Sequence, residues 1–179
     1  FKPGIKNLIT DVEGLFIGNS ENELINTGST ILSCKDRFTA SYRVLGGAPG
    51  TRETDLLEPD KLVEKIDALV LSGGSAFGLE AASETVNLLR KDNKGYEVGN
   101  NKIPIVPGAI IFDLMNGGEK TWDKNPYIDL AKKAYNNLCS SFKLGSYGAG
   151  KGATAGNIKG GLGSASLMID NKYTVGALM

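Results

Sequence analysis

We expect the fold to be organised around residues 68–78, which read Ala68-Leu69-Val70-Leu71-Ser72-Gly73-Gly74-Ser75-Ala76-Phe77-Gly78 in a chain of 179 residues. The first four residues form a continuous apolar run, which predicts a strand buried on both faces of a sheet. The glycines that follow predict a tight turn, and the apolar spacing beyond them predicts a helix from about Phe77 to Lys91.

The glycine turn lies between a strand and a helix, where nucleophile elbows and phosphate loops occur. It matches neither motif. An elbow needs G-x-S-x-G and a histidine partner, and a phosphate loop needs Gly-Lys followed by Ser or Thr. Two interpretations stay open: the turn amides bind an anion or oxyanion at the positive end of the helix, or the glycines only let strand and helix pack closely.

The composition excludes several kinds of chemistry. The chain has no histidine, so it holds no Ser-His-Asp or Cys-His pair and no His-ligated zinc or copper. Its 20 Lys and Arg balance 20 Asp and Glu without a basic stripe, which argues against nucleic-acid binding. No apolar run approaches the roughly 20 residues of a membrane helix. Cys34 and Cys139 are predicted to be reduced thiols of a cytoplasmic protein.

Further strands and helices are predicted on both sides of the glycine turn. On the N-terminal side, Ser29–Cys34 and Thr39–Leu45 resemble a hairpin around the polar turn Lys35-Asp36-Arg37. After it, Pro59 is expected to open a short helix, and residues 93–101 are expected to form a polar loop.

On the C-terminal side, Asn125 and Pro126 are expected to begin a helix that runs to about Phe142. Leu162–Ile169 and Tyr173–Met179 predict a second hairpin around Asp170-Asn171-Lys172. Its apolar strand pattern reaches Met179 with no turn after it. We therefore expect that the chain continues or that a partner completes this sheet.

Lys159 is the most interesting single residue, because it is a lone amine among glycines just ahead of a predicted strand. It can orient a nucleophile or stabilise negative charge, or it can be an ordinary surface lysine.

The glycine tract 148–156 indicates close backbone approach rather than a dinucleotide site. The polar cluster 51–55 is expected to satisfy its own hydrogen bonds. Four single carboxylates show no metal or glycosidase spacing: Asp11, Glu13, Asp113 and Glu119.

Several segments in order carry a resemblance to one family over nearly the whole chain. They are Ile9–Leu15, Gly46–Leu57, Leu71–Leu79, Ile105–Asp113, Gly148–Gly150, Lys159–Ser166 and Tyr173–Leu178. Together they resemble the DmpA family of self-processing hydrolases. This family includes the L-aminopeptidase/D-amidase-esterase, the β-peptidyl aminopeptidases and the nylon-oligomer hydrolase, and the chain is most similar to the last branch.

The resemblance implies a fold, an activity and a partner. The fold is an α/β (α+β) class, four-layer α/β/β/α sandwich. Members cut themselves into an α chain and a β chain, and the new N-terminal Ser or Thr of the β chain is the nucleophile. Its own amine serves as base, so no histidine is needed. Residues 1–179 then resemble a single-domain α chain that stops short of the nucleophile and of the family's oxyanion-hole Asn.

The resemblance also suggests roles for a few residues. Lys159 corresponds to the family lysine near the nucleophile, with a role in orientation and charge stabilisation. Phe112 stands where several members place a pocket Tyr, so only an apolar wall is implied there. Ile110 stands where the β-peptidyl branch has a Glu for the substrate amine, which weakens an aminopeptidase interpretation. Gly74 and Ser75 are expected to border the pocket, and Lys151 receives no role.

The leading hypothesis is therefore the α chain of a self-cleaving aminopeptidase or amidase without cofactor or metal. Two alternatives are acyl transfer between amines, as in ornithine acetyltransferase, and a non-catalytic small-ligand binding domain on the same scaffold. The expected partners are the β chain of the same precursor, further αβ units in a homo-oligomer such as a tetramer, and a small peptide or amide substrate. Nucleic acid and membrane are not expected partners.

Overall fold

The computed structural model describes all 179 residues. Its strands are β1 (Lys2–Pro3), β2 (Leu15–Asn22), β3 (Thr27–Phe38), β4 (Thr51–Arg52), β5 (Ile66–Ser72), β6 (Tyr96–Val98), β7 (Asn101–Ile103), β8 (Gly108–Ile110), β9 (Thr154–Ala155), β10 (Ile158–Lys159), β11 (Ser164–Ile169) and β12 (Tyr173–Leu178). Its α-helices are α1 (Glu80–Lys91) and α2 (Tyr127–Asn136), and its short 3-10 helices are η1 (Ile9–Asp11), η2 (Asp55–Leu57), η3 (Ser75–Leu79) and η4 (Gly148–Gly150). None of these helices is long and apolar enough to cross a membrane.

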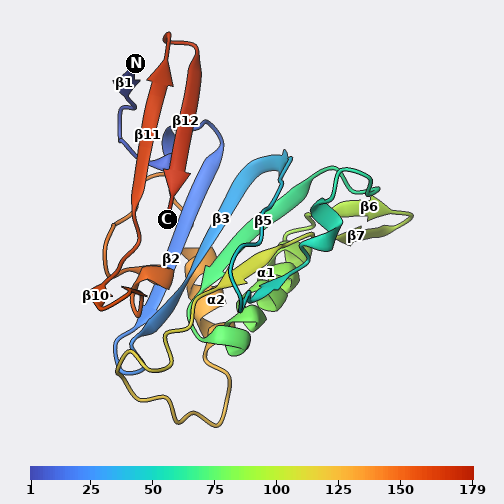
Figure 1. Cartoon of the computed structure of the whole chain (residues 1–179). Helices are drawn as coiled ribbons and strands as arrows, with labels where there is room; N and C mark the ends of the chain where they lie inside the picture. The colour runs from blue at the N-terminus through green and yellow to red at the C-terminus, as the bar shows by residue number, and fades with distance from the viewer.

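Two sheets and one helix layer make up the architecture (Figure 1). The larger sheet has the strand order β2-β3-β5-β8-β4; β5 and β8 are parallel and the other pairs are antiparallel. Helices α1 and α2 pack on each other and on one face of this sheet. The smaller sheet, β1-β11-β12, lies on the other side. The α/β class is confirmed, and the chain itself supplies a helix layer followed by two sheet layers.

The hydrophobic core lies between the larger sheet and the helices. It is a cluster of 11 buried residues, among them Ile31, Val70, Leu89 and Tyr127. Because side chains alternate along a strand, Ala68 and Val70 of β5 face the helices. Leu69 and Leu71 on the opposite face are only half-buried and line the space between the two sheets. The prediction that this strand is buried on both faces therefore holds for one face only.

The predicted elements that depend on local pattern are confirmed. The glycine turn has Gly74 at φ +86° and Ser75 at φ +53°, and it leads through η3 into α1, which ends at Lys91. The C-terminal hairpin forms with the three-residue connection 170–172 between the paired residues Ile169 and Tyr173, and Asp170 and Asn171 are both at positive φ, as in a type I′ turn. Asn125 caps α2, because its side-chain oxygen accepts the amide hydrogen of Tyr127 at 2.9 Å.

The hairpin predicted around Lys35-Asp36-Arg37 is wrong. Strand β3 continues through this triplet to Phe38, and its antiparallel partners are β2 and β5. The triplet stays extended because Arg37 reaches Asp67 of β5, with Nε 3.4 Å from Oδ1. The guanidinium of Arg37 also lies 5.3 Å from the ring centre of Tyr96. These distant contacts override the local turn signal.

Three other boundaries differ from expectation. The helix predicted from Pro59 does not form, and only the 3-10 turn η2 precedes it. The polar loop predicted at 93–101 holds most of the β6–β7 hairpin. Helix α2 ends at Asn136 rather than near Phe142, since Cys139 leaves the helix to exchange two backbone hydrogen bonds of 3.0 Å with Ile17 of β2.

Candidate active site

A small cavity opens at the carboxyl ends of the parallel strands β5 and β8. We call it the carboxyl-end cavity; it measures about 140 Å³. Its wall consists of Leu71, Ser72, Ala109, Ile110, Ile111, Ala149, Gly150, Ala153, Gly161, Leu162 and Met179. No charged side chain belongs to this wall, so the charge available at the site comes from residues behind it. Carboxyl ends of parallel strands are the usual place for ligand sites in α/β sheets.

Lys159 on β10 is bound to the backbone of this wall. Its Nζ lies 3.1 Å from the carbonyl oxygen of Gly150, 3.4 Å from that of Ala153 and 2.7 Å from that of Gly160. Lys159 forms no ion pair. An ammonium has three donors and no acceptor, and the three carbonyls use all of them. The residue is exposed, and these three contacts hold its amine beside the wall.

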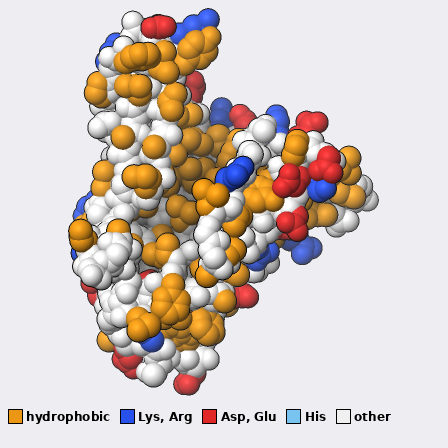
Figure 2. Space-filling model, in the orientation of Figure 1, with side chains coloured by type: hydrophobic (Ala, Val, Ile, Leu, Met, Phe, Trp, Pro, Cys, Tyr) orange, Lys and Arg blue, Asp and Glu red, His pale blue; other side chains and the backbone are white.

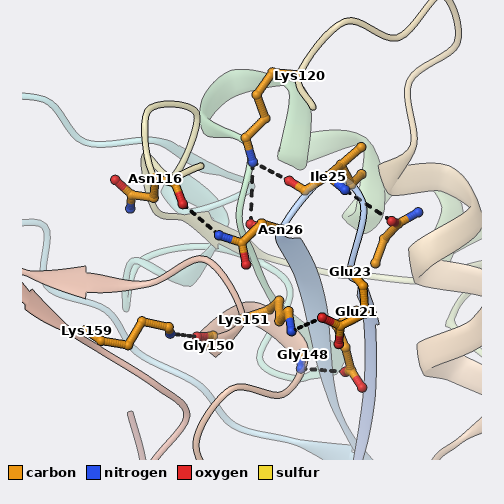
Figure 3. A network of polar contacts seen from close by, with 11 residues as sticks. Glu21, Glu23, Ile25, Asn26, Asn116, Lys120, Gly148, Gly150, Lys151 and Lys159 are labelled. Atoms are coloured by element: carbon orange, nitrogen blue, oxygen red, sulfur yellow. Dashed lines mark hydrogen bonds and ion pairs between the residues drawn. The ribbon is translucent and has the colours of Figure 1, made fainter. Parts of the chain in front are cut away.

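Side chains from β2, from the turn after it and from the loop before α2 hold the glycine segment 148–152, and Figure 3 shows the contacts of Glu21 and Glu23. The amide of Gly148 donates to Glu21 Oε2 at 2.9 Å. Lys151 donates to the carboxylate of Glu23. Asn116 Nδ2 donates to the carbonyl oxygen of Gly152 at 2.8 Å. The position of the Lys159 ammonium therefore depends on contacts made by residues far away in the sequence.

Three amides of the first glycine turn are engaged inside the protein. Gly73 N donates to the carbonyl oxygen of Gly28 at 2.9 Å, and Ser75 N donates to that of Ile111 at 3.0 Å. Gly74 N donates to Asp113 Oδ1 at 2.7 Å. These three amides are therefore not available to an anion. Of the two interpretations of this turn, the geometry favours close packing of strand and helix.

Asp113 forms a buried polar network beneath the turn. Its side chain is fully buried, and its Oδ2 accepts the hydroxyl hydrogen of Thr27 at 2.5 Å. The hydroxyl of Tyr127 lies 3.1 Å from Thr27 Oγ1. Burial raises the pKa of Tyr127 to about 12, with a smaller contribution from the nearby Asp113 carboxylate. Tyr127 thus stays protonated at any physiological pH, and the network ties β3, the turn and α2 together.

The predicted site residues divide between this cavity and its surroundings. Lys159 touches the wall backbone, and Ile110 belongs to the wall. Phe112, Gly74 and Ser75 lie just beyond it. Phe112 is 57% exposed, so its role as an apolar pocket wall stays a prediction. The roles of Gly74 and Ser75 stay predictions in the same way.

Sequence reasoning did not single out Asp113 or Asn116 as residues that organise the site. Asp113 had a weak signal, because it directly follows the apolar stretch 109–112, which forms the end of β8 and the residues after it, at the same sheet edge as the glycine turn. Asn116 had no such signal.

Ser72 is a wall residue, but its Oγ is buried and lies 2.8 Å from Ser29 Oγ, with no base beside it. It is a structural hydroxyl.

A second, larger cavity separates the two sheets. It measures about 500 Å³, and residues of β3, β5, the segment before β4 and residues 176–178 of β12 form much of its lining, most of which is hydrophobic. Figure 2 shows hydrophobic side chains along the β11–β12 sheet and in the hollow between this sheet and the rest of the molecule. We call this space the inter-sheet cavity.

Comparison with known proteins identifies the family. A family model described as peptidase family S58 matches residues 7–179. The chain belongs to peptidase family S58. The predicted resemblance to the DmpA family is thereby confirmed.

Curated relatives of the S58 chain are named as aminopeptidases. It is 39% identical over 180 residues to an uncharacterized aminopeptidase of Mycobacterium tuberculosis (strain ATCC 25618 / H37Rv), a match that covers 96% of this chain and 52% of that protein. It is 36% identical over 186 residues to an uncharacterized aminopeptidase of Mycobacterium leprae (strain TN), a match that covers 97% of this chain and 51% of that protein. The chain spans about half the length of the curated relatives it matches.

Solved structures show the fold of the S58 chain. A Pyrococcus horikoshii OT3 protein superposes with a TM-score of 0.77 at 24% identity, over 99% of this chain and 54% of that one. The L-aminopeptidase D-Ala-esterase/amidase of Ochrobactrum anthropi superposes with a TM-score of 0.76 at 20% identity, and the match covers 99% of this chain and 53% of that one. The latter is described as a new variant among the Ntn hydrolase fold. The S58 chain has this fold over nearly its full length.

Proposed function

We propose that this chain is the α chain of a self-processing amide or peptide hydrolase whose nucleophile, a Ser or Thr, is the N-terminal residue of a β chain from the same precursor. The observation that carries the proposal is the Lys159 ammonium, fixed by three carbonyls, two of which belong to wall residues of the carboxyl-end cavity. Membership of peptidase family S58 and coverage of about half of each relative support it.

In the proposed reaction the β-chain hydroxyl attacks the amide carbonyl carbon, and the free α-amine of the same residue takes the hydroxyl proton. The carbonyl oxygen becomes an oxyanion, and the fixed charge of Lys159 stabilises it. The C–N bond then breaks, and the protonated α-amine returns its proton to the leaving amine. Water hydrolyses the resulting acyl-enzyme ester. The absence of histidine fits this mechanism, because the terminal amine is the base.

The direction of β12 supports the location of the reaction. The ladder between β11 and β12 continues past Leu178, since Gly163 and Met179 exchange two backbone hydrogen bonds of 2.7 and 2.8 Å. Met179 is itself a wall residue of the carboxyl-end cavity. We therefore place the nucleophile and the oxyanion-hole Asn beside this wall, on the segments that complete the enzyme.

The β chain also accounts for the apolar inter-sheet cavity. In the complete enzyme we expect the β chain to extend the smaller sheet, to supply the fourth, helical layer and to fill this space.

We further propose that αβ units form a homo-oligomer such as a tetramer in the cytoplasm. Two free cysteines, Cys34 and Cys139, agree with a reducing compartment.

The deciding experiment is expression of the complete precursor. Mass spectrometry should show two fragments, the smaller one starting with Ser or Thr, and replacing that residue by Ala should leave the precursor uncut. A precursor that is still cleaved after this replacement overturns the proposed nucleophile. Incubation with peptide amides should release the acid in water. Transfer of the acyl group to an added amine instead would favour the acetyltransferase alternative, and no turnover would favour a binding domain.

A further inference from the structure

A polar pocket lies at the end of the larger sheet opposite to the carboxyl-end cavity. We call it the amino-end pocket; it measures about 210 Å³. Its lining is Cys34, Lys35, Asp36, Arg37, Asp67, Asn93, Lys94, Gly95 and Lys102. In Figure 1 the β6–β7 hairpin marks this end of β5 and β10 marks the other. Asp67 and Ser72 are five residues apart on β5, which separates the two sites by about 16 Å.

The lining is strongly polar and carries an excess of positive charge. Four cationic side chains, those of Lys35, Arg37, Lys94 and Lys102, face two carboxylates, those of Asp36 and Asp67. Only one lining residue is hydrophobic. The whole chain has no net charge, so this local excess is not a general property of its surface.

Asp67 has little capacity left to neutralise the pocket. Its side chain is 3% exposed, its Oδ1 lies 3.4 Å from Arg37 Nε, and its Oδ2 accepts the amide hydrogen of Ile105 at 2.9 Å. The carboxylate therefore fixes Arg37 and the chain before β8. Arg37 is further held by the ring of Tyr96 and by the carbonyl oxygen of Lys65.

Arg37 is held in one position beside the pocket. Its Nε atom is buried against Asp67 at 3.4 Å, although this contact does not meet hydrogen-bond geometry. Its Nη2 donates to Lys65, and its Nη1 makes no hydrogen bond and is the donor left for a ligand. A guanidinium held in place in this way is pre-organised for an oxyanion.

Two lysines complete the arrangement. Lys35 and Lys94 form no ion pair, and their side chains make no hydrogen bond. Lys102 is 3.4 Å from Glu97, whose side chain is 72% exposed and gives a weak, solvent-screened pair. Two free ammonium groups and one fixed guanidinium thus line the pocket, from β3 and from the loop between α1 and β6, and the exposed Asp36 is the one unpaired carboxylate beside them.

We propose that the amino-end pocket binds a phosphate-sized oxyanion, either inorganic phosphate or the phosphoryl group of a small metabolite. Charge-assisted hydrogen bonds from Arg37, Lys35 and Lys94 would bind the anion oxygens. The volume holds a phosphoryl group together with water, and the polar lining disfavours an apolar ligand. The anion site does not rest on the proposed function.

Isothermal titration calorimetry of the complete protein with inorganic phosphate, in chloride buffer, tests this assignment. We expect saturable binding with one phosphate per chain. The double variant Lys35→Gln/Lys94→Gln should weaken it by about tenfold or more. The control Lys61→Gln/Lys124→Gln makes the same charge change at exposed lysines outside the pocket and should leave binding unchanged.

The same titration identifies the source of the anion. A phosphomonoester such as glycerol 3-phosphate that binds more tightly than phosphate indicates a metabolite, and equal affinities indicate the free ion. No saturable binding of either ligand overturns the proposal. Equal weakening in the pocket variant and in the control variant also overturns it, because the anion is then attracted only by diffuse surface charge. Both pairs of lysines are surface residues, so all variants should keep the thermal unfolding midpoint of the unmodified protein.

Discussion

Lys159 Nζ lies 3.1 Å from the carbonyl oxygen of Gly150, a wall residue of the carboxyl-end cavity, so a positive charge is fixed at the proposed reaction centre. Removing a preorganised stabiliser of an oxyanion lowers kcat on the order of 10²–10³-fold. We expect Lys159→Ala in the processed enzyme to show such a loss, measured by amide hydrolysis. Lys159→Arg should recover only part of it, since a planar guanidinium cannot reproduce three converging donors.

Lys124→Ala is the matched control for this prediction, because Lys124 is exposed and forms no ion pair. It should leave kcat unchanged. A Lys159→Ala enzyme with full kcat and normal processing would show that the residue is an ordinary surface lysine. A loss of kcat accompanied by a lower unfolding midpoint would indicate a structural role for Lys159 instead.

Gly74 lies directly against the aromatic ring of Tyr127, and its backbone has φ +86°. A Cβ at this position would overlap the Cζ, hydroxyl and Cε2 atoms of that ring. We expect Gly74→Ala to lower the free energy of unfolding by about 2–5 kcal/mol, because left-handed strain and overpacking add. Urea unfolding of the processed protein measures this change.

Gly99 provides the comparison for Gly74. It has φ +57° with no atom within 4 Å of an added Cβ. Gly99→Ala should therefore cost only the conformational strain, about 1 kcal/mol. Equal losses in the two variants would mean that contact with Tyr127 contributes nothing to the constraint on the glycine turn.

Asp113 accepts hydrogen bonds from Gly74 N and Thr27 Oγ1 while fully buried. Asp113→Ala leaves the Gly74 amide without a partner and opens space at a fully buried position, and we expect it to destabilise the protein by about 3 kcal/mol. Asp113→Asn keeps an acceptor for the amide, and the Thr27 hydroxyl can turn to donate to Tyr127 instead. The Asn variant should therefore lose less stability than the Ala variant in urea unfolding. The opposite order would contradict this account of the network.

The parts of the fold that follow from nearby residues could be predicted from the sequence. The apolar run 68–71, its glycines and the helical spacing after them are local, and so are the alternation and the Asp170-Asn171 turn of the last hairpin. Strand β3 could not be predicted through Lys35-Asp36-Arg37. The contacts that keep this triplet extended come from Asp67 and Tyr96, which are distant in sequence.

The same distinction applies to the candidate site. Lys159 stood out because it is a single amine in a glycine tract that also matched a family motif. Asp113 was one of several isolated carboxylates, since its partners Gly74 and Thr27 lie 39 and 86 residues away. No periodicity or spacing rule connects such residues, because only the folded sheet brings them together.

Asp11 and Ser166 join η1 to strand β11, and this contact should make stability depend on acid pH. Ser166 Oγ donates to Asp11 Oδ2 at 2.7 Å, and this bond, with help from the amides of Lys6 and Leu8, holds the pKa of Asp11 below its ordinary value of 3.8. A lowered carboxyl pKa stabilises the folded state above the unfolded-state pKa. This contribution disappears as the pH falls through the folded-state value.

Ser166→Ala should therefore lower the thermal unfolding midpoint by a constant amount from pH 7 to about pH 5. The difference should shrink as the pH falls below about 4. Ser164→Ala is the matched control, because Ser164 Oγ bonds only to the backbone of Ile9 and Ala177. Its effect should not vary with pH. If the Ser166→Ala difference stays the same down to about pH 3, the ionised form of Asp11 is not what Ser166 stabilises.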